Sequence, residues 1–269
     1  MCSSDLNTPR QIQIYNALGV PTPYYAHVPM ILGPDKTRLS KRHGAMSVLA
    51  YRDMGYLPHA LLNALVRLGW SHGDQEKFTR EELIETFSLE NVGKSAGVFN
   101  LEKLIDLNAQ YIRETSDQDL AGLLAPFLDA TGIRGVPARQ LEAAVATLKP
   151  RSRTLVEMAD AARMYFDETL SYEEKGDKKF LVPEVLPHLE DLARRLKVME
   201  SFTEAALEDV FRAYLEERGI KLKEVAQPLR LALTGRTASP GLFEVMVVLG
   251  RDEVLRRIDR VLHHIEAKR

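Results

Sequence analysis

Cationic side chains are concentrated in residues 38–44, which read Arg-Leu-Ser-Lys-Arg-His-Gly. Several of these side chains carry or can acquire a positive charge, namely Arg38, Lys41, Arg42 and His43. Lysine supplies a point charge to a phosphate oxygen, while serine hydroxyls and backbone N–H groups donate hydrogen bonds to others. A loop of this kind could bind a triphosphate and stabilise the charge that develops on a leaving pyrophosphate. Composition alone favours a second interpretation, a solvated basic turn.

A second cationic segment, residues 227–258, is expected to contain helices separated by a Thr-Gly-Arg turn. Arg230 and Arg236 lie beside this turn, and Ser239-Pro240 is predicted to cap and start the next helix. Arginine can hydrogen-bond the edges of single-stranded RNA bases, and a helix N-terminus offers backbone N–H donors. The alternative is an apolar pair of packed helices with exposed arginines, which the residues alone favour.

A third segment, residues 148–166, carries three cations near a helix that is predicted to start at Pro150: Lys149, Arg151 and Arg153. Cations at a helix N-terminus oppose the helix dipole. The arrangement indicates either an anionic partner or a tolerated exposed surface.

Helices are expected to position these segments. A short strand is predicted within residues 24–32, and helical periodicity dominates from about residue 46. Thr79 and Glu82 form a capping-box pattern, and Ser116 and Thr203 are further predicted caps. Apolar stripes define the buried faces, and the stripe of the last helix comprises Val254, Leu255, Ile258, Val261, Leu262 and Ile265.

The composition is typical of a globular protein: of 269 residues, 45% are hydrophobic and 28% are charged, with a formal net charge of −2. The single cysteine, Cys2, excludes an internal disulfide and a cysteine-based zinc site, and favours a reducing, cytoplasmic setting. His263 and His264 are adjacent on a predicted helix and point apart, so no metal site is predicted. Trp70, the only tryptophan, is assigned to packing. No apolar run of about 18 residues occurs, so no membrane span is expected.

Residues 27–74 resemble the KMSKS-loop region of bacterial-type glutamate–tRNA ligases, a family of class I aminoacyl-tRNA synthetases. Upstream NTPRQIQIYNALG and downstream FSLENVGKSAGVFNLEKL and LNAQYIR are also similar, so the resemblance runs from about Asn7 to the end. The family form of the loop is close to Lys-Leu-Ser-Lys-Arg-His-Gly, and Arg38 stands where lysine is usual. The resemblance implies that Ser40, Lys41 and Arg42 contact ATP and that Lys41 stabilises the activation transition state. Mg²⁺ is the usual companion of ATP in the family, and no ligands for it are identifiable in this sequence.

Residues 227–258 resemble the anticodon-binding domain of the same ligases. By position, the residues implied to read anticodon bases are Arg230, Ser239, Pro240 and Leu242, with Ser239 where threonine is common. Arg153 matches an arginine that reads the third anticodon base in discriminating members. The resemblance therefore predicts tRNA(Glu) as partner and rejection of the glutamine tRNA. A glutamine–tRNA ligase is disfavoured, because its anticodon modules are β-barrels and this half is predicted to be helical.

The implied fold is mainly α and has four parts. Residues 1–50 are the residual C-terminal edge of a class I Rossmann-type catalytic domain, with the KMSKS-type loop. Residues 51–117 are a helical stem-contact subdomain. Residues 118–173 and 174–269 are the first and second helical parts of an all-α anticodon-binding domain.

The family's His-Ile-Gly-His signature does not occur, because none of the seven histidines lies in a His-x-Gly-His pattern, and the opening MCSSDL departs from the family. We therefore expect a truncated or mis-started ligase chain. Within a full-length, monomeric enzyme it would help to attach L-glutamate to tRNA(Glu) using ATP, whereas alone it is predicted to be inactive. Two alternatives stay open: a module that only binds the tRNA anticodon arm, and a paralogue with an RNA-binding or regulatory role.

Overall fold

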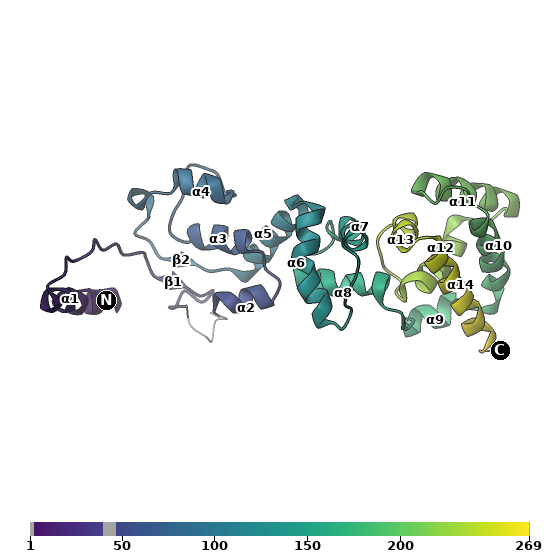
Figure 1. Ribbon diagram of the computed structural model, residues 1–269, viewed down its shortest axis with the longest axis horizontal. Helices are drawn as coiled ribbons and strands as arrows, with labels where there is room; N and C mark the ends of the chain where they lie inside the picture. The colour runs from purple at the N-terminus through teal and green to yellow at the C-terminus, as the bar shows by residue number, and fades with distance from the viewer. Residues whose placement is uncertain (1–2, 40–46, 269) are drawn as a thin grey trace. The chain divides into compact units, whose positions relative to one another are not determined.

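Helices account for most of the structure, a computed structural model that describes residues 3–39 and 47–268 (Figure 1). The chain divides into two compact units, Met1–Glu114 and Thr115–Arg269. The mainly α fold class that the sequence predicts is confirmed. The finer division into four parts, with boundaries near residues 50, 117 and 173, stays a prediction. In the described ranges no helix is both long and apolar enough to cross a membrane.

The first unit combines α-helices with one pair of two-residue strands. Its elements are α1 (Ser3–Leu18), β1 (Ile31–Leu32), α2 (Val48–Asp53), α3 (Pro58–Val66), α4 (Arg80–Thr86), the 3₁₀ helix η2 (Leu89–Asn91), β2 (Gly97–Val98) and α5 (Leu101–Glu114). The strands are parallel, with Ile31 opposite Gly97. The short strand predicted within residues 24–32 is confirmed at Ile31–Leu32, and residues 24–30, which include Pro29, are not in a strand.

Two apolar clusters hold the first unit together. The first contains Tyr51, Tyr56, Leu61, Phe99 and Leu104, and the second contains Trp70, Phe78 and Leu83. Trp70 is 4% exposed and packs edge-on against Phe78, which confirms its assignment to packing. The buried Asn63 side chain adds a polar tie: its Oδ1 accepts from the Phe78 N–H, and its Nδ2 donates to the Glu76 carbonyl, both at 2.9 Å.

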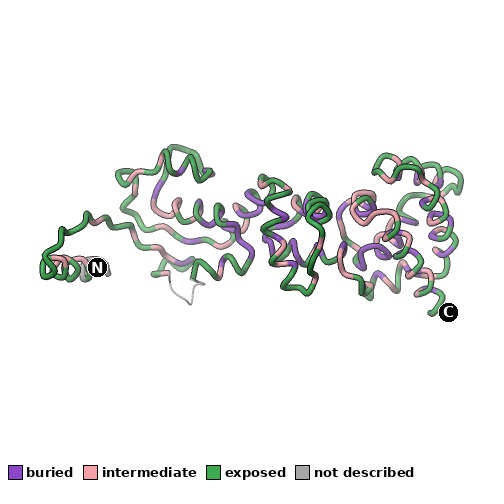
Figure 2. Tube along the Cα trace, in the orientation of Figure 1, coloured by how far each residue is buried: buried purple, intermediate pink, exposed green. Residues whose placement is uncertain are grey.

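The second unit is all helical in its described part. Its elements are α6 (Asp117–Ala130), α7 (Ala138–Leu148), α8 (Leu155–Phe166), α9 (Glu174–Phe180), the 3₁₀ helix η3 (Pro183–Val185), α10 (Leu186–Lys197), α11 (Glu204–Arg218), α12 (Leu222–Thr234), α13 (Leu242–Leu249) and α14 (Arg251–Glu266). The helix α14 packs against α10, α12 and α13, and α13 also contacts α7 and α8. Figure 2 shows buried residues along these facing sides.

Local capping fixes several helix starts where the sequence predicts them. The Thr79 hydroxyl accepts from the Glu82 N–H at 3.1 Å, and the Glu82 carboxylate accepts from the Thr79 N–H at 2.7 Å, so the capping box is confirmed. The hydroxyls of Ser116 and Thr203 cap α6 and α11. These starts follow from residues three positions apart, which is why the sequence alone reveals them.

The predicted helix start at Pro150 was wrong. Pro150 lies in the turn between α7 and α8, and α8 begins at Leu155. Thr154 is the N-cap, and its hydroxyl accepts from the Glu157 N–H at 3.1 Å. The side-chain cap therefore decides the boundary, and the proline only shapes the turn before it.

Candidate functional site

The basic segment near the N-terminus is described only at its two edges. The three residues assigned to ATP lie outside the described residues: Ser40, Lys41 and Arg42. Before them, a tight turn is closed by the Gly33 N–H, which donates to the Thr37 carbonyl at 2.8 Å. The Asp35 carboxylate accepts from the Thr37 N–H at 3.0 Å. After the gap, the Ser47 hydroxyl caps α2 by accepting from the Ala50 N–H at 3.3 Å. The role of the loop in binding ATP stays a prediction.

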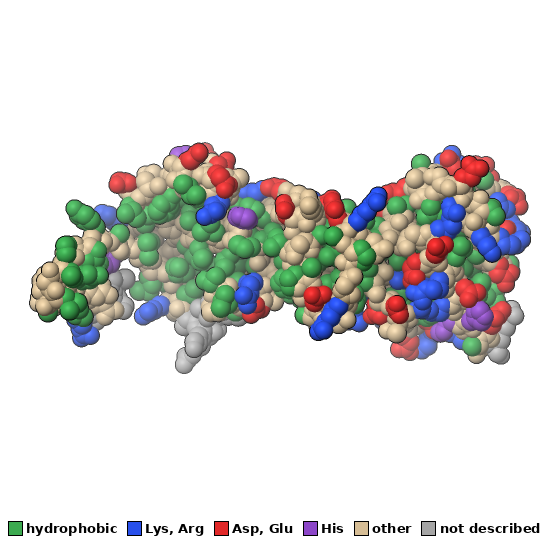
Figure 3. Space-filling view, in the orientation of Figure 1, with side chains coloured by type: hydrophobic (Ala, Val, Ile, Leu, Met, Phe, Trp, Pro, Cys, Tyr) green, Lys and Arg blue, Asp and Glu red, His purple; other side chains and the backbone are tan. Residues whose placement is uncertain are grey.

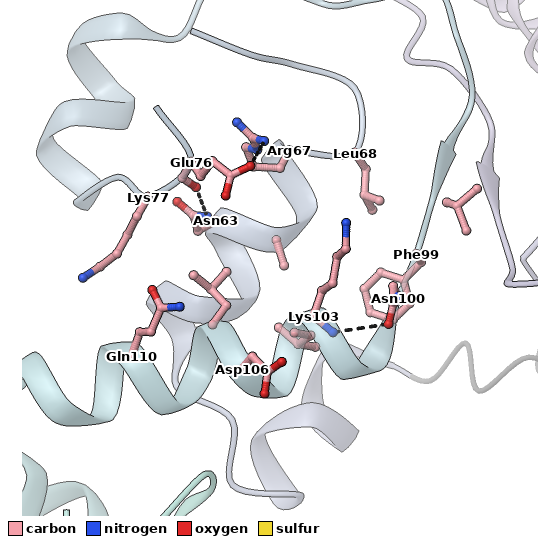
Figure 4. Close-up of a pocket in the computed structure, with 14 residues that line it drawn as sticks. Asn63, Arg67, Leu68, Glu76, Lys77, Phe99, Asn100, Lys103, Asp106 and Gln110 are labelled. Atoms are coloured by element: carbon pink, nitrogen blue, oxygen red, sulfur yellow. Dashed lines mark hydrogen bonds and ion pairs between the residues drawn. The ribbon is translucent and has the colours of Figure 1, made fainter. Parts of the chain in front are cut away.

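A pocket of about 430 Å³ opens between α3 and α5 of the first unit (Figure 4). Its apolar wall includes Leu68, Phe99 and Leu104, while Arg67 and Lys103 bring positive charge to it. Arg67 donates to the Gln75 carbonyl at 2.7 Å and pairs with Glu76 at 3.1 Å, so its charge is partly neutralised. The sequence does not single out this pocket, and its mixed lining points to no one class of ligand.

The second unit brings together residues that the sequence assigns to anticodon reading. The half-buried Arg230 guanidinium lies on α12 and extends to the loop before α13. Its Nη1 donates to the Pro240 carbonyl at 2.7 Å, to the Ser239 carbonyl at 3.3 Å and to the Ser239 hydroxyl. Residues nine and ten positions apart in the chain therefore form one polar cluster.

The predicted cap at Ser239 was wrong. The N-cap of α13 is Gly241, and its N–H donates to the Glu244 carboxylate at 2.8 Å. The Ser239 hydroxyl instead donates to the Pro240 carbonyl at 2.9 Å and accepts from Arg230. Leu242, the first residue of α13, is 7% exposed, so its side chain offers little surface to a ligand.

The loop between α12 and α13 is held from several sides. Arg236 pairs with Asp160 of α8 at 2.9 Å. The Glu173 carboxylate accepts from the Thr237 N–H at 3.0 Å and from the Thr237 hydroxyl at 2.7 Å. Gly235 has a φ of 71°, which glycine adopts without strain, and the Glu173 N–H donates to its carbonyl at 2.8 Å. These contacts fix the chain on which Ser239 lies.

The electrostatics around Arg230 favour an anionic or hydrogen-bond-accepting ligand. Burial lowers the pKa of the Arg230 guanidinium, and the positive charge of Arg151 lowers it further. The Nη1 of Arg151 donates to the Thr147 carbonyl at 3.1 Å. Among the described residues, no carboxylate pairs with either guanidinium. Two guanidiniums without an ion-pair partner among the described residues make this face a candidate site for a ligand that accepts hydrogen bonds.

The cations near residue 150 do not lie in the first turn of a helix. Lys149, Arg151 and Arg153 each contact a different group. The exposed Arg153 precedes the N-cap of α8, and its N–H donates to the Glu157 carboxylate at 2.9 Å. Lys149 pairs with Asp117 at 2.8 Å, so it ties α7 to α6. Arg151 is the cation of this segment that acts on Arg230, a role that the sequence does not assign. Only the crowding of cations near residue 150 signals it.

The comparisons with known proteins agree with this geometry. A family model described as "Anticodon binding domain" matches residues 119–262, and one described as "tRNA synthetases class I (E and Q), catalytic domain" matches residues 4–106. A glutamate–tRNA ligase from Syntrophobacter fumaroxidans is 58% identical over 263 residues, which are 97% of this chain and 56% of that protein. The chain belongs to the glutamate–tRNA ligase family.

Further members of the glutamate–tRNA ligase family support the assignment. The protein of that name from Geobacter sulfurreducens is 54% identical over 260 residues, covering 97% of this chain and 56% of that protein. A crystal structure of a glutamate tRNA ligase from Elizabethkingia meningosepticum superposes with a TM-score of 0.80 at 26% identity, covering 97% of this chain and 56% of that one. The chain thus spans about half the length of the family members that it matches.

For this glutamate–tRNA ligase family member, the comparisons confirm the predicted family and the all-α anticodon-binding fold. The anticodon-binding match includes all the residues assigned to RNA: Arg153, Arg230, Ser239, Pro240 and Leu242. Their individual roles in reading bases stay predictions. Among the described residues, no cluster of three or more His, Cys, Asp or Glu side chains could hold a metal ion.

Proposed function

We propose that this chain is part of a glutamate–tRNA ligase that attaches L-glutamate to tRNA(Glu) using ATP, and that its second unit reads the anticodon. The observation that carries the proposal is the Arg230 cluster, which lies inside the region matched by the anticodon-binding family model. Membership of the chain in the glutamate–tRNA ligase family supports the proposed activity. The hydrogen bonds of Arg230 support the proposed contacts with the anticodon.

Arg230 is suited to hydrogen-bond a splayed RNA base. Its Nη1 is occupied by the Ser239 and Pro240 oxygens, and among the described residues no acceptor bonds Nε or Nη2. These two donors form the side of the guanidinium that binds base edges and phosphates in a bidentate manner. Ser239 and Pro240 therefore orient Arg230, and the Ser239 hydroxyl gives the same cluster a second polar group. Arg153, on the approach to α8, is the proposed reader of the third anticodon base, which predicts rejection of the glutamine tRNA.

The first unit is proposed to contribute to ATP binding through Ser40, Lys41 and Arg42. Lys41 would stabilise the charge that develops on pyrophosphate as the glutamyl adenylate forms. Mg²⁺ would arrive with the nucleotide and help to neutralise its phosphates. L-glutamate is the proposed amino-acid substrate of the whole enzyme, which we expect to be a cytoplasmic monomer.

We expect the 269-residue chain to be inactive when assayed alone, because its sequence contains no His-x-Gly-His pattern. The second candidate function is a module that binds tRNA without catalysis. It is supported by the fact that the chain spans only about half the length of its relatives. Glutamate-dependent ATP–pyrophosphate exchange separates the two. Exchange above background would contradict the expected inactivity, and its absence with intact tRNA binding would support the module.

The deciding experiment measures binding of the chain to a tRNA(Glu) transcript at fixed low salt, because phosphate contacts make affinity salt-dependent. Arg230→Ala is expected to weaken binding by about 1–3 kcal/mol, the range of a bidentate contact to a base. Arg212→Ala is the matched control, because Arg212 is an exposed cation of α11 that pairs only with Asp209 in the described structure. It is expected to change affinity little.

A third-anticodon-base variant of the transcript completes the test. Wild-type protein should prefer the unaltered transcript, and Arg153→Ala should reduce that preference. Equal effects of the Arg230 and Arg212 changes, together with no preference between transcripts, would refute anticodon reading. A circular-dichroism spectrum of each variant checks that weak binding does not reflect loss of fold.

A further inference from the structure

A buried arginine outside the assigned site joins the helices that carry it. Arg257 lies on α14 and is 2% exposed, although the stripe of which it is part is otherwise apolar. Its Nη1 donates to the Met164 carbonyl at 2.5 Å and to the Leu233 carbonyl, and its Nη2 donates to the Tyr165 carbonyl at 3.2 Å. Its Nε donates to Glu253, one turn earlier on the same helix. One side chain thus bonds α8, α12 and α14.

The acceptors are the last carbonyls of two helices. Met164 and Tyr165 lie in the final turn of α8, and Leu233 lies in the final turn of α12. Carbonyls in these positions have no partner within their own helix, and the helix dipole makes them the negative ends. A guanidinium meets both needs, because its donors form a rigid planar fork and its charge is permanent. Glu253 supplies the counter-charge that a buried cation requires.

These contacts lie directly behind the proposed anticodon site. Leu233 is one helical turn beyond Arg230 on α12. On the other side, the Tyr165 hydroxyl is hydrogen-bonded to the Thr147 hydroxyl at 2.7 Å, and the Thr147 carbonyl accepts from Arg151. Arg257 therefore holds the backbone of α12, which carries Arg230, and of α8, to which Arg153 is joined by its bond to Glu157. No comparable bond from another buried cation links α8 to α12 within the described residues.

We propose that Arg257 is a positioning residue for anticodon recognition, which sets the position of α12 relative to α8 and hence that of Arg230 relative to Arg153. This inference rests on the proposed function of the second unit. Arg257 contacts no RNA in this arrangement, since it is buried. It acts through the two helix ends, so its loss should affect selectivity among anticodons more than general attraction to RNA phosphates.

The test compares variants by their preference for tRNA(Glu) over the third-anticodon-base variant, measured with the full chain as a ratio of dissociation constants. Arg257→Met removes every bond to α8 and α12 and is expected to lower the preference about tenfold, within the range of a base contact. Arg257→Lys keeps the charge, but its single ammonium cannot reach all three carbonyls, so an intermediate preference is expected. Ile265→Ala is the control, because Ile265 is buried on the same helix two turns later.

A merely structural role would lower the folded fraction and both affinities together, leaving the ratio unchanged. Folded protein that carries Arg257→Met with the wild-type ratio would therefore overturn the inference. So would an equal loss of ratio in Ile265→Ala. If Arg257→Met does not fold by circular dichroism, Arg257→Lys decides, and an unchanged ratio in that variant overturns the inference. Wild-type protein without any preference would overturn the proposed function itself, which is a distinct result.

Discussion

The two units of this chain differ in how completely they bury their apolar side chains. In the first unit, large apolar residues are exposed both before residue 31, as at Ile14 and Leu18, and after it, as at Val48, Ile84 and Leu89. Figure 3 shows hydrophobic side chains of this unit, coloured green, at the molecular surface. In the second unit the exposed apolar residues are scattered, and the helices share facing buried surfaces. The second unit therefore has the more self-contained core, and it also carries the proposed anticodon site.

The largest expected effect comes from opening a cavity in the second unit. Phe211 is buried on α11 and packs edge-on against Phe243, with ring centroids 5.0 Å apart. Phe211→Ala should lower the free energy of unfolding by about 3–5 kcal/mol. Leu18→Ala, at an exposed position of the first unit, should change it by about 0.5 kcal/mol or less. Urea unfolding followed by far-ultraviolet circular dichroism measures both free energies. Equal losses in the two variants would contradict the difference in apolar burial between the units.

A smaller effect is expected from the polar tie of the first unit. Asn63→Leu keeps the side-chain volume but leaves the Phe78 N–H and the Glu76 carbonyl without their partners. We expect a loss of about 1–3 kcal/mol for a buried group left unsatisfied. Hydrogen exchange at the Phe78 amide should accelerate, while exchange at the Val245 amide of the second unit should not. Unchanged protection at Phe78 would mean that the apolar clusters alone hold this unit.

The smallest expected effect is a pH dependence of the loop beside the anticodon site. Hydrogen bonds from the Thr237 hydroxyl and N–H lower the pKa of Glu173 below its ordinary value of 4.5. A carboxyl whose pKa is lowered by folding contributes stability above its unfolded-state pKa and loses it as pH falls through the folded-state pKa. Protection of the Thr237 amide, after correction for intrinsic exchange, should therefore decrease as pH falls below about 4.5. In Glu173→Gln this decrease should disappear.

What the sequence predicts correctly is mostly local. The caps at Thr79, Ser116 and Thr203 depend on residues three positions apart, and all are present. The predicted cap at Ser239 was wrong, because the Ser239 hydroxyl accepts from Arg230 of another helix and Gly241 is the N-cap. The short strand predicted within residues 24–32 is present, but the sequence did not reveal its two-residue length, because its partner β2 lies far along the chain.

The candidate site was predicted through family resemblance and not through spacing. Composition alone left Arg230 as an exposed cation beside a turn, and the structure bonds it to Ser239 and Pro240. The sequence does not predict the role of Arg257, because its partners on α8 lie more than 90 residues earlier in the chain. The sequence names Arg151 as one of several crowded cations but not its effect on Arg230, because this effect arises only when the second unit has folded.

The placement of Trp70 gives the first unit an optical signal of its own. It is the only tryptophan in the chain, and it lies in the first unit against Phe78 and Phe87. Its fluorescence therefore reports on the first unit alone, whereas the helical signal comes from both. A denaturation followed with both probes would give two superimposable curves if the units unfold together and two separate midpoints if they do not. The natural sequence thus contains a built-in reporter, and no label is needed to assign a transition to one half of the chain.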